Sequence, residues 1–199
     1  MNLPITARRL SVLLALALTG THFAAGQSTP AATVATPLEV AGTFSYVHTN
    51  APPGGCGCFA LFGGSGSAAY YYGAHFALVG DVSFVHRGNV DNTGQFLSFS
   101  SYMVGARVPV PLHRMRITPY GQILIGVTRE SGTFAHVVAT SFQNDTEFSA
   151  AGGGGLDYRL TPRITLRAIQ AEYLLTRFPN GVNGRQNNLR LESGVALRF

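Results

Sequence analysis

The chain contains no lysine and no tryptophan, and charged residues make up only 12% of its 199 residues. A soluble globular domain carries about 25% charged residues, so this composition is unusual. Although 46% of the residues are hydrophobic, no apolar run after the first twenty residues approaches the roughly 18 that a membrane-spanning helix needs. The sequence therefore argues against a helical membrane protein.

The abundant residues exclude further classes. The chain has 24 glycines, 13 phenylalanines and 8 tyrosines, whereas disordered chains have few aromatic residues and low hydrophobicity. Stretches of good helix formers are scarce beyond the N-terminus, which argues against a helical bundle or a coiled coil. All fourteen basic residues are arginine, and they occur without the basic run that is typical of nucleic-acid binding. We expect no nucleic-acid partner.

Residues 1–26 have the three parts of a secretory signal peptide. Arg8 and Arg9 supply a basic start, Leu10–Leu18 is a short apolar core, and Ala24-Ala25-Gly26 supplies small residues for cleavage. The apolar core of about nine residues is too short to cross a bilayer as a helix. We therefore predict export with cleavage of this peptide.

The rest of the chain divides into a short lead-in and one domain. Residues 27–37 are rich in Ser, Thr, Ala and Pro, a composition typical of a flexible segment. From residue 38 to residue 199 the pattern of the sequence changes, and the length fits a single domain. We predict a flexible lead-in over 27–37 and one domain over 38–199.

In this domain, apolar residues recur at every second position, most clearly at the C-terminus. The apolar face there carries Leu189, Leu191, Val195, Leu197 and Phe199, and the opposite face carries Asn188, Arg190, Glu192 and Arg198. The alternation lasts about eleven residues, which is the length of a β-strand that crosses a bilayer. A half-buried strand of a soluble protein is usually five or six residues long.

Seven further segments show comparable alternation: Leu38–His48, Ser67–Gly73, Phe76–His86, Gln95–Arg107, Ile117–Thr128, Phe148–Tyr158 and Ile164–Leu175. In Gln95–Arg107, we place the apolar residues Leu97, Phe99 and Met103 on one face, opposite Ser98, Ser100 and Tyr102. In Ile164–Leu175 the alternation slips, and a β-bulge at Ala168-Ile169 would let Gln170 and Glu172 face inward with Arg167.

The predicted connections differ in length between the two ends of the strands. Those at the outer end are Thr49–Gly66, Arg87–Gly94, Arg129–Glu147 and Thr176–Asn187; those at the inner end are Ala74-His75, Val108–Met115 and Arg159–Pro162. Long loops on one side and short turns on the other are typical of outer-membrane barrels. We predict an all-β fold, an eight-stranded antiparallel up-and-down transmembrane β-barrel, because closure also removes unpaired edges.

Several segments carry a resemblance to a known family: Thr118-Pro-Tyr-Gly-Gln122, Gly152–Asp157, Glu172–Phe178, Gln186–Arg190 and Gly194–Phe199. The domain resembles the small OmpA-like proteins of the outer membrane β-barrel family. That resemblance implies a location in the bacterial outer membrane among its lipids. It also implies that the terminal strand, with Val195, Leu197 and Phe199, is similar to the signal that the barrel-assembly machinery recognises. The family includes anchors, adhesins, small pores and occasional lipid enzymes.

The charged residues on the polar faces are the first candidate site: Asp81, Asp157, Arg167, Glu172, Arg190, Glu192 and Arg198. An eight-stranded barrel has an interior just wide enough for side chains to fill it, so we expect opposite charges to pair in a closed lumen. A narrow polar channel and a pair of catalytic carboxylates are the alternatives. Arg107 is ambiguous, because it shares the face of Phe99 and Met103 and can reach lipid headgroups at the inner rim.

Cys56 and Cys58 lie in the predicted first outer connection. Two cysteines in an exported chain predict a disulfide, and a single intervening residue would make that ring strained and easily reduced. A metal site with His48, His86 or His136 is the alternative, but two cysteines without a second pair are a poor zinc signal. We take the loop disulfide as the default.

Two glycine runs call for an explanation. Gly63-Gly-Ser-Gly66 follows no clear strand and opens no helix, so we expect no phosphate site there. Gly152–Gly155 lies within a predicted strand. Bare backbone in a strand permits sharp curvature or the close approach of a bulky neighbour such as a tyrosine.

Nucleophilic catalysis requires a hydroxyl with a base in reach. The sequence has no His-x-Ser, and both Ser83 with His86 and Ser45 with His48 fall on opposite strand faces. We therefore predict no enzyme, no catalytic residue, no metal and no cofactor. The predicted function is that of an outer-membrane structural or surface-interaction barrel with an unidentified extracellular ligand. A narrow pore for small solutes or ions is the alternative, and a lipid-modifying enzyme is a third option.

Overall fold

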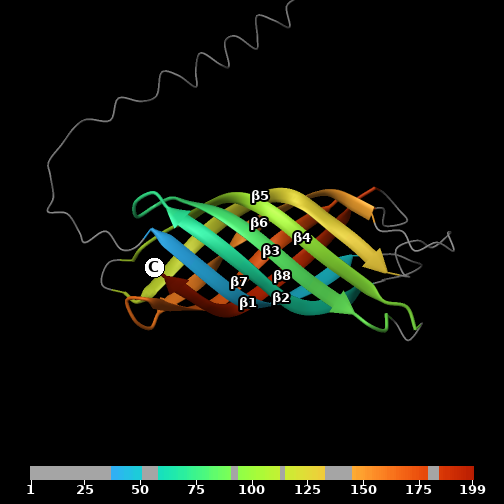
Figure 1. The fold of residues 1–199 in the computed structure, drawn as a ribbon, viewed down its shortest axis with the longest axis horizontal. Helices are drawn as coiled ribbons and strands as arrows, with labels where there is room; N and C mark the ends of the chain where they lie inside the picture. The colour runs from blue at the N-terminus through green and yellow to red at the C-terminus, as the bar shows by residue number, and fades with distance from the viewer. Residues whose placement is uncertain (1–36, 51–57, 91–93, 113–114, 133–144, 179–183) are drawn as a thin grey trace, which may run out of the picture. The chain divides into compact units, whose positions relative to one another are not determined.

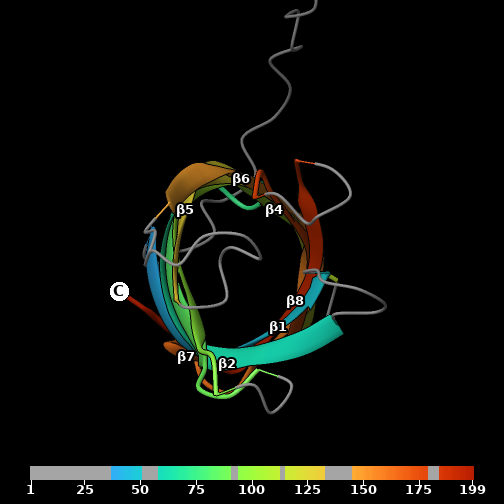
Figure 2. The same ribbon diagram turned by 90° about the vertical axis from the view of Figure 1, so that its right-hand side faces the viewer.

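The computed structural model describes residues 37–50, 58–90, 94–112, 115–132, 145–178 and 184–199. Eight antiparallel strands form one closed barrel in which each strand pairs with its two neighbours (Figures 1 and 2). The strands are β1 (Leu38–Asn50), β2 (Cys58–Tyr71), β3 (Ala77–Arg87), β4 (Leu97–Pro109), β5 (Ile117–Gly132), β6 (Asp145–Arg159), β7 (Ile164–Thr176) and β8 (Gln186–Arg198). Within these ranges, no helix is long and apolar enough to cross a membrane. The predicted eight-stranded barrel is confirmed.

The strands are staggered around the barrel. The paired residues can be followed from Leu38 through all eight strands, and the path returns to β1 at His48, ten residues farther along. A stagger of this kind tilts every strand against the barrel axis. With eight strands, the interior is only wide enough for side chains to fill it.

The two ends of the barrel differ in their connections. We call the end where β1 begins and β8 ends the inner end, and the opposite end the outer end (Figure 1). The strand bounds leave four to seven residues for each inner connection and seven to twelve for each outer one. Short turns on the periplasmic side and longer loops outside the cell are the rule in such barrels.

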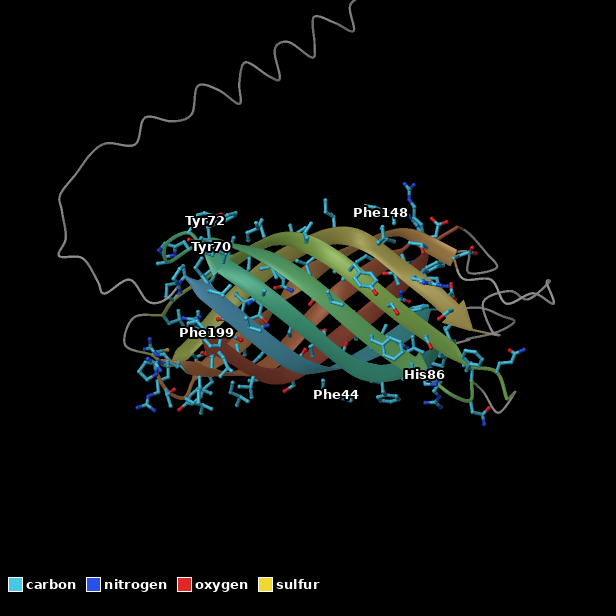
Figure 3. All side chains as sticks on the ribbon, in the orientation of Figure 1. Phe44, Tyr70, Tyr72, His86, Phe148 and Phe199 are labelled. Atoms are coloured by element: carbon cyan, nitrogen blue, oxygen red, sulfur yellow. The ribbon has the colours of Figure 1, made fainter. Side chains whose placement is uncertain are left out.

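The outward face of the wall is apolar. Val82, Ile123 and Ile125 are 52%, 69% and 54% exposed near the middle of their strands. Aromatic side chains lie towards both ends of this band: Tyr70, Tyr72 and Phe199 at the inner end, and Phe148 in the outer half (Figure 3). An apolar band between two aromatic girdles is the surface that a β-barrel presents to a bilayer.

The structure corrects the predicted position of the second strand. Residues 58–66 belong to β2 and not to an outer connection. Gly63 pairs with Ser45 on β1 and with Val85 on β3, and a Cβ at Gly63 would lie 1.9 Å from the carbonyl oxygen of Phe84. Glycine is required here because two strands approach closely, and a glycine-rich strand lacks the side-chain alternation from which strands are predicted.

The structure also reverses the predicted face of β4. Leu97, Phe99 and Met103 face the interior and are 0%, 1% and 3% exposed, whereas Tyr102 and Val104 face outward. Apolar residues occur on both faces of this strand, so alternation alone does not say which face meets lipid. The predicted β-bulge in β7 is confirmed, because the register between β7 and β8 shifts between Arg167 and Gln170.

Candidate functional site

Glu39 is the centre of a charged cluster in the inner half of the lumen. Its carboxylate accepts hydrogen bonds from Arg107 at 3.1 Å, Arg167 at 3.0 Å and Arg198 at 2.9 Å. Arg167 also donates to Asp157 at 3.1 Å. Since the arginines come from β4, β7 and β8, they tie opposite sides of the wall to one carboxylate on β1. Glu39 and Arg107 are each 1% exposed.

Arg190 is the centre of a second cluster, nearer the middle of the barrel. It donates to Asp81 at 2.8 Å and to Glu172 at 2.7 Å, and Glu192 lies 3.7 Å away. Arg190 is on β8 and Asp81 is on β3, so this side chain spans the lumen. Arg190 is fully buried, and a buried charge is tolerated only when it is paired and hydrogen-bonded.

Two glutamines connect these clusters. Gln122 accepts from Arg107 at 2.9 Å and donates to Glu172 at 2.6 Å. Gln170 accepts from the Tyr120 hydroxyl at 2.6 Å and donates to Glu192 at 2.7 Å. The clusters form one network, which we call the lumen network: Glu39, Asp81, Arg107, Tyr120, Gln122, Asp157, Arg167, Gln170, Glu172, Arg190, Glu192 and Arg198.

The glycine run of β6, Gly152–Gly155, leaves room for the Tyr120 side chain in this network. A Cβ at Gly155 would lie 2.5 Å from the Tyr120 hydroxyl oxygen, so only glycine admits the ring there. This confirms the predicted approach of a tyrosine to the glycine run. The guanidinium carbons of Arg107 and Arg167 lie 4.6 and 5.2 Å from the centre of the Tyr120 ring, within the range of a cation–π contact.

The outer half of the lumen is filled differently. A group of buried apolar side chains comes from β1, β2, β3, β4 and β7 and the residues just after β7, beside buried polar side chains of the same half: Thr49, Ser101, Thr128, Glu130, Ser149, Thr176, Gln186 and Asn188. Phe99 and Phe178 stack there with ring centres 5.8 Å apart. The members of this outer apolar layer are Val47, Phe59, Leu61, Val85, Leu97, Phe99, Leu174 and Phe178, all 5% exposed or less.

The structure places every predicted lumen charge in the interior, with Arg198 at the inner rim at 26% exposure. Sequence reasoning missed Glu39 and Arg107. Glu39 is only the second residue of the predicted first strand, Leu38–His48. The side of the wall on which Arg107 lies was left ambiguous, because the predicted face of β4 was reversed. The four arginines of the network face five carboxylates, so the charges inside are nearly balanced.

A serine and a histidine that sequence reasoning did not pair lie together on the outward face. His86 Nδ1 is 2.8 Å from Ser98 Oγ across the β3–β4 pair. The sequence argument compared serine and histidine residues of the same strand, so it could not find this pair, whose members are on neighbouring strands. Ser98 is only 8% exposed, which closes its hydroxyl to a lipid ester, and we interpret the contact as structural.

The predicted disulfide and the alternative metal site involve residues that the structure does not fully describe. Cys56 lies outside the described residues, as does His136, and the side chain of Cys58 is not described, so the predicted disulfide stays a prediction. Among the residues that the structure describes, no group of three or more His, Cys, Asp or Glu side chains could hold a metal ion.

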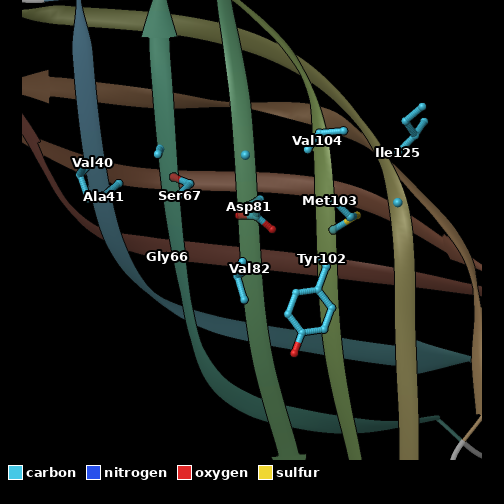
Figure 4. A pocket seen from close by; sticks show the side chains of 13 residues that line it. Val40, Ala41, Gly66, Ser67, Asp81, Val82, Tyr102, Met103, Val104 and Ile125 are labelled. Carbon is cyan, nitrogen blue, oxygen red and sulfur yellow. The ribbon is translucent and has the colours of Figure 1, made fainter.

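One hollow of about 600 Å³ lies on the wall of the barrel over β1 to β5 (Figure 4). Small residues, Gly66, Ala68 and Gly80, leave the backbone uncovered there, and the exposed side chains of Tyr102 and Val104 border it. Because most of its lining faces outward within the apolar band, this hollow is a depression of the lipid-facing wall.

Comparison with known proteins agrees with this geometry. The model of the outer membrane protein β-barrel domain matches residues 11–199, and no curated sequence matches the chain. Solved structures that are similar in fold include the following three. Neisserial surface protein A has a TM-score of 0.62 at 17% identity, covering 82% of this chain and 98% of that one.

The other two are Ail and OprG. Ail of Yersinia pestis has a TM-score of 0.54 at 15% identity, covering 81% of this chain and 98% of its own. OprG of Pseudomonas aeruginosa has a TM-score of 0.55 at 12% identity, covering 83% and 96%. At such identities the likeness shows the fold. The family match and the closed barrel together establish that the chain belongs to the outer membrane β-barrel family and is a small barrel of the bacterial outer membrane.

Proposed function

We propose that this protein is a non-conducting barrel that anchors its outer connections at the cell surface, where they act in structural or interaction roles without catalysis. The observation that carries the proposal is the filling of the lumen. Arg190 bridges from β8 to Asp81 on β3, Arg167 and Arg107 converge on Glu39, and the outer apolar layer lies above both clusters. A path for ions would have to separate these pairs.

Conductance of the purified full-length protein in planar bilayers tests whether the lumen is closed. We expect no discrete channels from the wild type. Discrete channels that disappear or change in conductance in Arg190→Gln, and that are unchanged in the outer-rim control Arg177→Gln, would overturn the closed lumen in favour of a narrow pore. The control is matched because Arg177 is exposed and lies outside the lumen network.

An interaction role is supported by the similarity to Ail, which has been solved in complex with the heparin analogue sucrose octasulfate. For this chain we propose a ligand that is bound by the outer connections, and sucrose octasulfate is a suitable first probe because Arg129 and Arg177 are exposed at the outer end. Binding to protein in nanodiscs, lost when both are changed to Gln, is the expected result. No binding of this probe would exclude sulfated sugars as the ligand.

The absence of catalysis has its own test. Lipid A from cells that express the protein should keep its mass, as should lipid A from cells that express Ser98→Ala. A mass change that requires Ser98 would show that the buried hydroxyl reacts and would replace the proposal with a lipid-modifying enzyme.

A further inference from the structure

Four neighbouring strands each carry an arginine at their inner ends. Arg116 directly precedes β5, Arg159 ends β6, Arg163 directly precedes β7 and Arg198 ends β8. Backbone hydrogen bonds bring them together in pairs: the Arg159 amide donates to the Arg116 carbonyl at 2.8 Å, and the Arg198 amide donates to the Arg163 carbonyl at 2.9 Å. One half of the inner rim is therefore a basic arc.

Three of the four arginines of the basic arc have no acidic partner in the described part of the chain. Glu39 and Asp157, the acids nearest to this end, are buried in the lumen and bound by the arginines of the network. Arg198 is one of those arginines. Arg116, Arg159 and Arg163 are exposed, and none of the ion pairs between described residues involves them. Their charge is available to an anion outside the protein.

Each of these three arginines has an exposed aliphatic neighbour in the sequence. Met115, next to Arg116, is 58% exposed, and Leu160, next to Arg159, is 47% exposed. Ile164 follows Arg163 and is 38% exposed. A soluble anion would leave these side chains in water. A lipid would cover them with acyl chains while its headgroup met the arginines, as amphipathic residues do at a membrane interface.

The opposite half of the rim provides a contrast. The inner ends of β1 to β4 carry aromatic and aliphatic side chains, among them Tyr70, Tyr72 and Phe76. These side chains have T-shaped or tilted contacts with one another, with ring centres 5.0 and 6.1 Å apart. No exposed arginine occurs there among the described residues. Any preference for anionic lipid should therefore be confined to the β5–β8 half.

We propose that Arg116, Arg159 and Arg163 form a binding surface for anionic phospholipids of the periplasmic leaflet. The guanidiniums hold the headgroup phosphate, and Met115 and Leu160 contact the acyl chains. Arginine suits this role because its planar group binds phosphate through two parallel hydrogen bonds and stays charged at every physiological pH. The chain contains no lysine, so every basic group at this rim has that geometry.

The natural absence of tryptophan permits a local test. An indole introduced by Leu160→Trp reports on the basic arc, and one introduced by Tyr72→Trp reports on the aromatic half. Each full-length variant is placed in phosphatidylcholine vesicles that contain either brominated phosphatidylglycerol or brominated phosphatidylcholine, and quenching gives the relative affinity. We expect a preference for phosphatidylglycerol of about fivefold or more at position 160 and about none at position 72.

The preference at position 160 should disappear when Arg116, Arg159 and Arg163 are all changed to Gln. It should survive in Arg129→Gln, the matched control at the outer rim. Heat-modifiable migration on a gel identifies the variants that have folded. Equal preference at the two positions would overturn the proposal, as would a preference that persists in the triple variant. Loss of the preference in inorganic phosphate, but not in chloride of equal ionic strength, would instead assign the arc to a soluble anion.

Discussion

The inner and outer halves of the lumen are enclosed by the same eight strands but are filled by different chemistry. The inner half holds a hydrogen-bonded network of arginines, carboxylates and glutamines, whereas the outer half holds stacked aromatic and aliphatic side chains beside buried hydroxyl and amide groups and one carboxyl group, Glu130. In the proposed function, neither filling leaves a continuous open path. The comparison shows that the interior of a membrane barrel need not be polar throughout, because the lumen of eight strands is narrow enough to be packed like a core.

The two fillings differ in how they respond to change. A charge in the network depends on several partners at once, so its loss leaves other charges unpaired in a buried place. An apolar side chain in the outer half has only its contacts and its volume to lose. The comparison can therefore be tested by single substitutions in each half, with controls on the outward face.

The largest effect is expected for Arg190→Met, which leaves Asp81, Glu172 and Glu192 without their shared cation. Removing one member of a buried ionic cluster costs about 3–5 kcal/mol, and we expect a loss of that size in the free energy of unfolding. Urea titration of the protein refolded into vesicles measures it.

The control for that variant is Arg177→Met. Arg177 is exposed and its guanidinium carbon lies 5.7 Å from the centre of the Phe148 ring, an arrangement worth about 1 kcal/mol or less at exposed sites. Equal losses in the two variants would show that the network contributes no more than a surface contact.

A smaller loss, about 3 kcal/mol, is expected for Phe99→Ala, because this ring is 1% exposed and stacks on Phe178. Val104→Ala on the outward face of the same strand should cost about 0.5 kcal/mol or less, as surface substitutions usually do, since lipid refills the vacated space. The same urea titration measures both variants. The reverse order of effects would mean that β4 has the orientation predicted from its sequence.

The smallest expected effect concerns the wall of the inner half. In Gly155→Ala, the added methyl group would lie 2.5 Å from the Tyr120 hydroxyl oxygen and 2.6 Å from the Ile169 carbonyl oxygen, and we expect a loss of about 1–3 kcal/mol from the displaced ring and the shifted strand. Gly152→Ala is the matched control, because nothing lies within 4 Å of a Cβ at that position. A shift of the urea midpoint for Gly155→Ala alone is the expected outcome, and equal shifts would remove the special role of Tyr120.

Some elements were predictable because a bilayer makes opposite demands on the two faces of a strand. The terminal strand alternates cleanly, so its inward residues Arg190 and Glu192 could be identified from the sequence. The bulge in β7 was predictable for the same reason, because Gln170 and Glu172 had to return to the face of Arg167. A charged residue that faces hydrocarbon destabilises the barrel: a lipid-facing arginine at the bilayer midplane lowers the free energy of unfolding by about 2–4 kcal/mol.

Other elements were not predictable, and each failure has a physical cause. Gly63 belongs to a strand in which the absence of a side chain is itself the requirement, so the usual pattern is missing. Phe99 faces an apolar part of the lumen, where the contrast between inside and outside disappears. The Ser98–His86 contact joins neighbouring strands through their register, which is set by pairing and not by the spacing of residues within one segment.

The sequence by itself determined the closed antiparallel barrel, the seven predicted lumen charges and the low overall charge, because alternation at every second residue separates a lipid face from an interior. Tertiary structure decided which partners those charges have. Glu39 and Arg107 are 68 residues apart, and Arg190 and Asp81 are 109 apart. Only the stagger of a closed barrel brings such residues to one level, since strand pairing and closure together fix the height of every side chain.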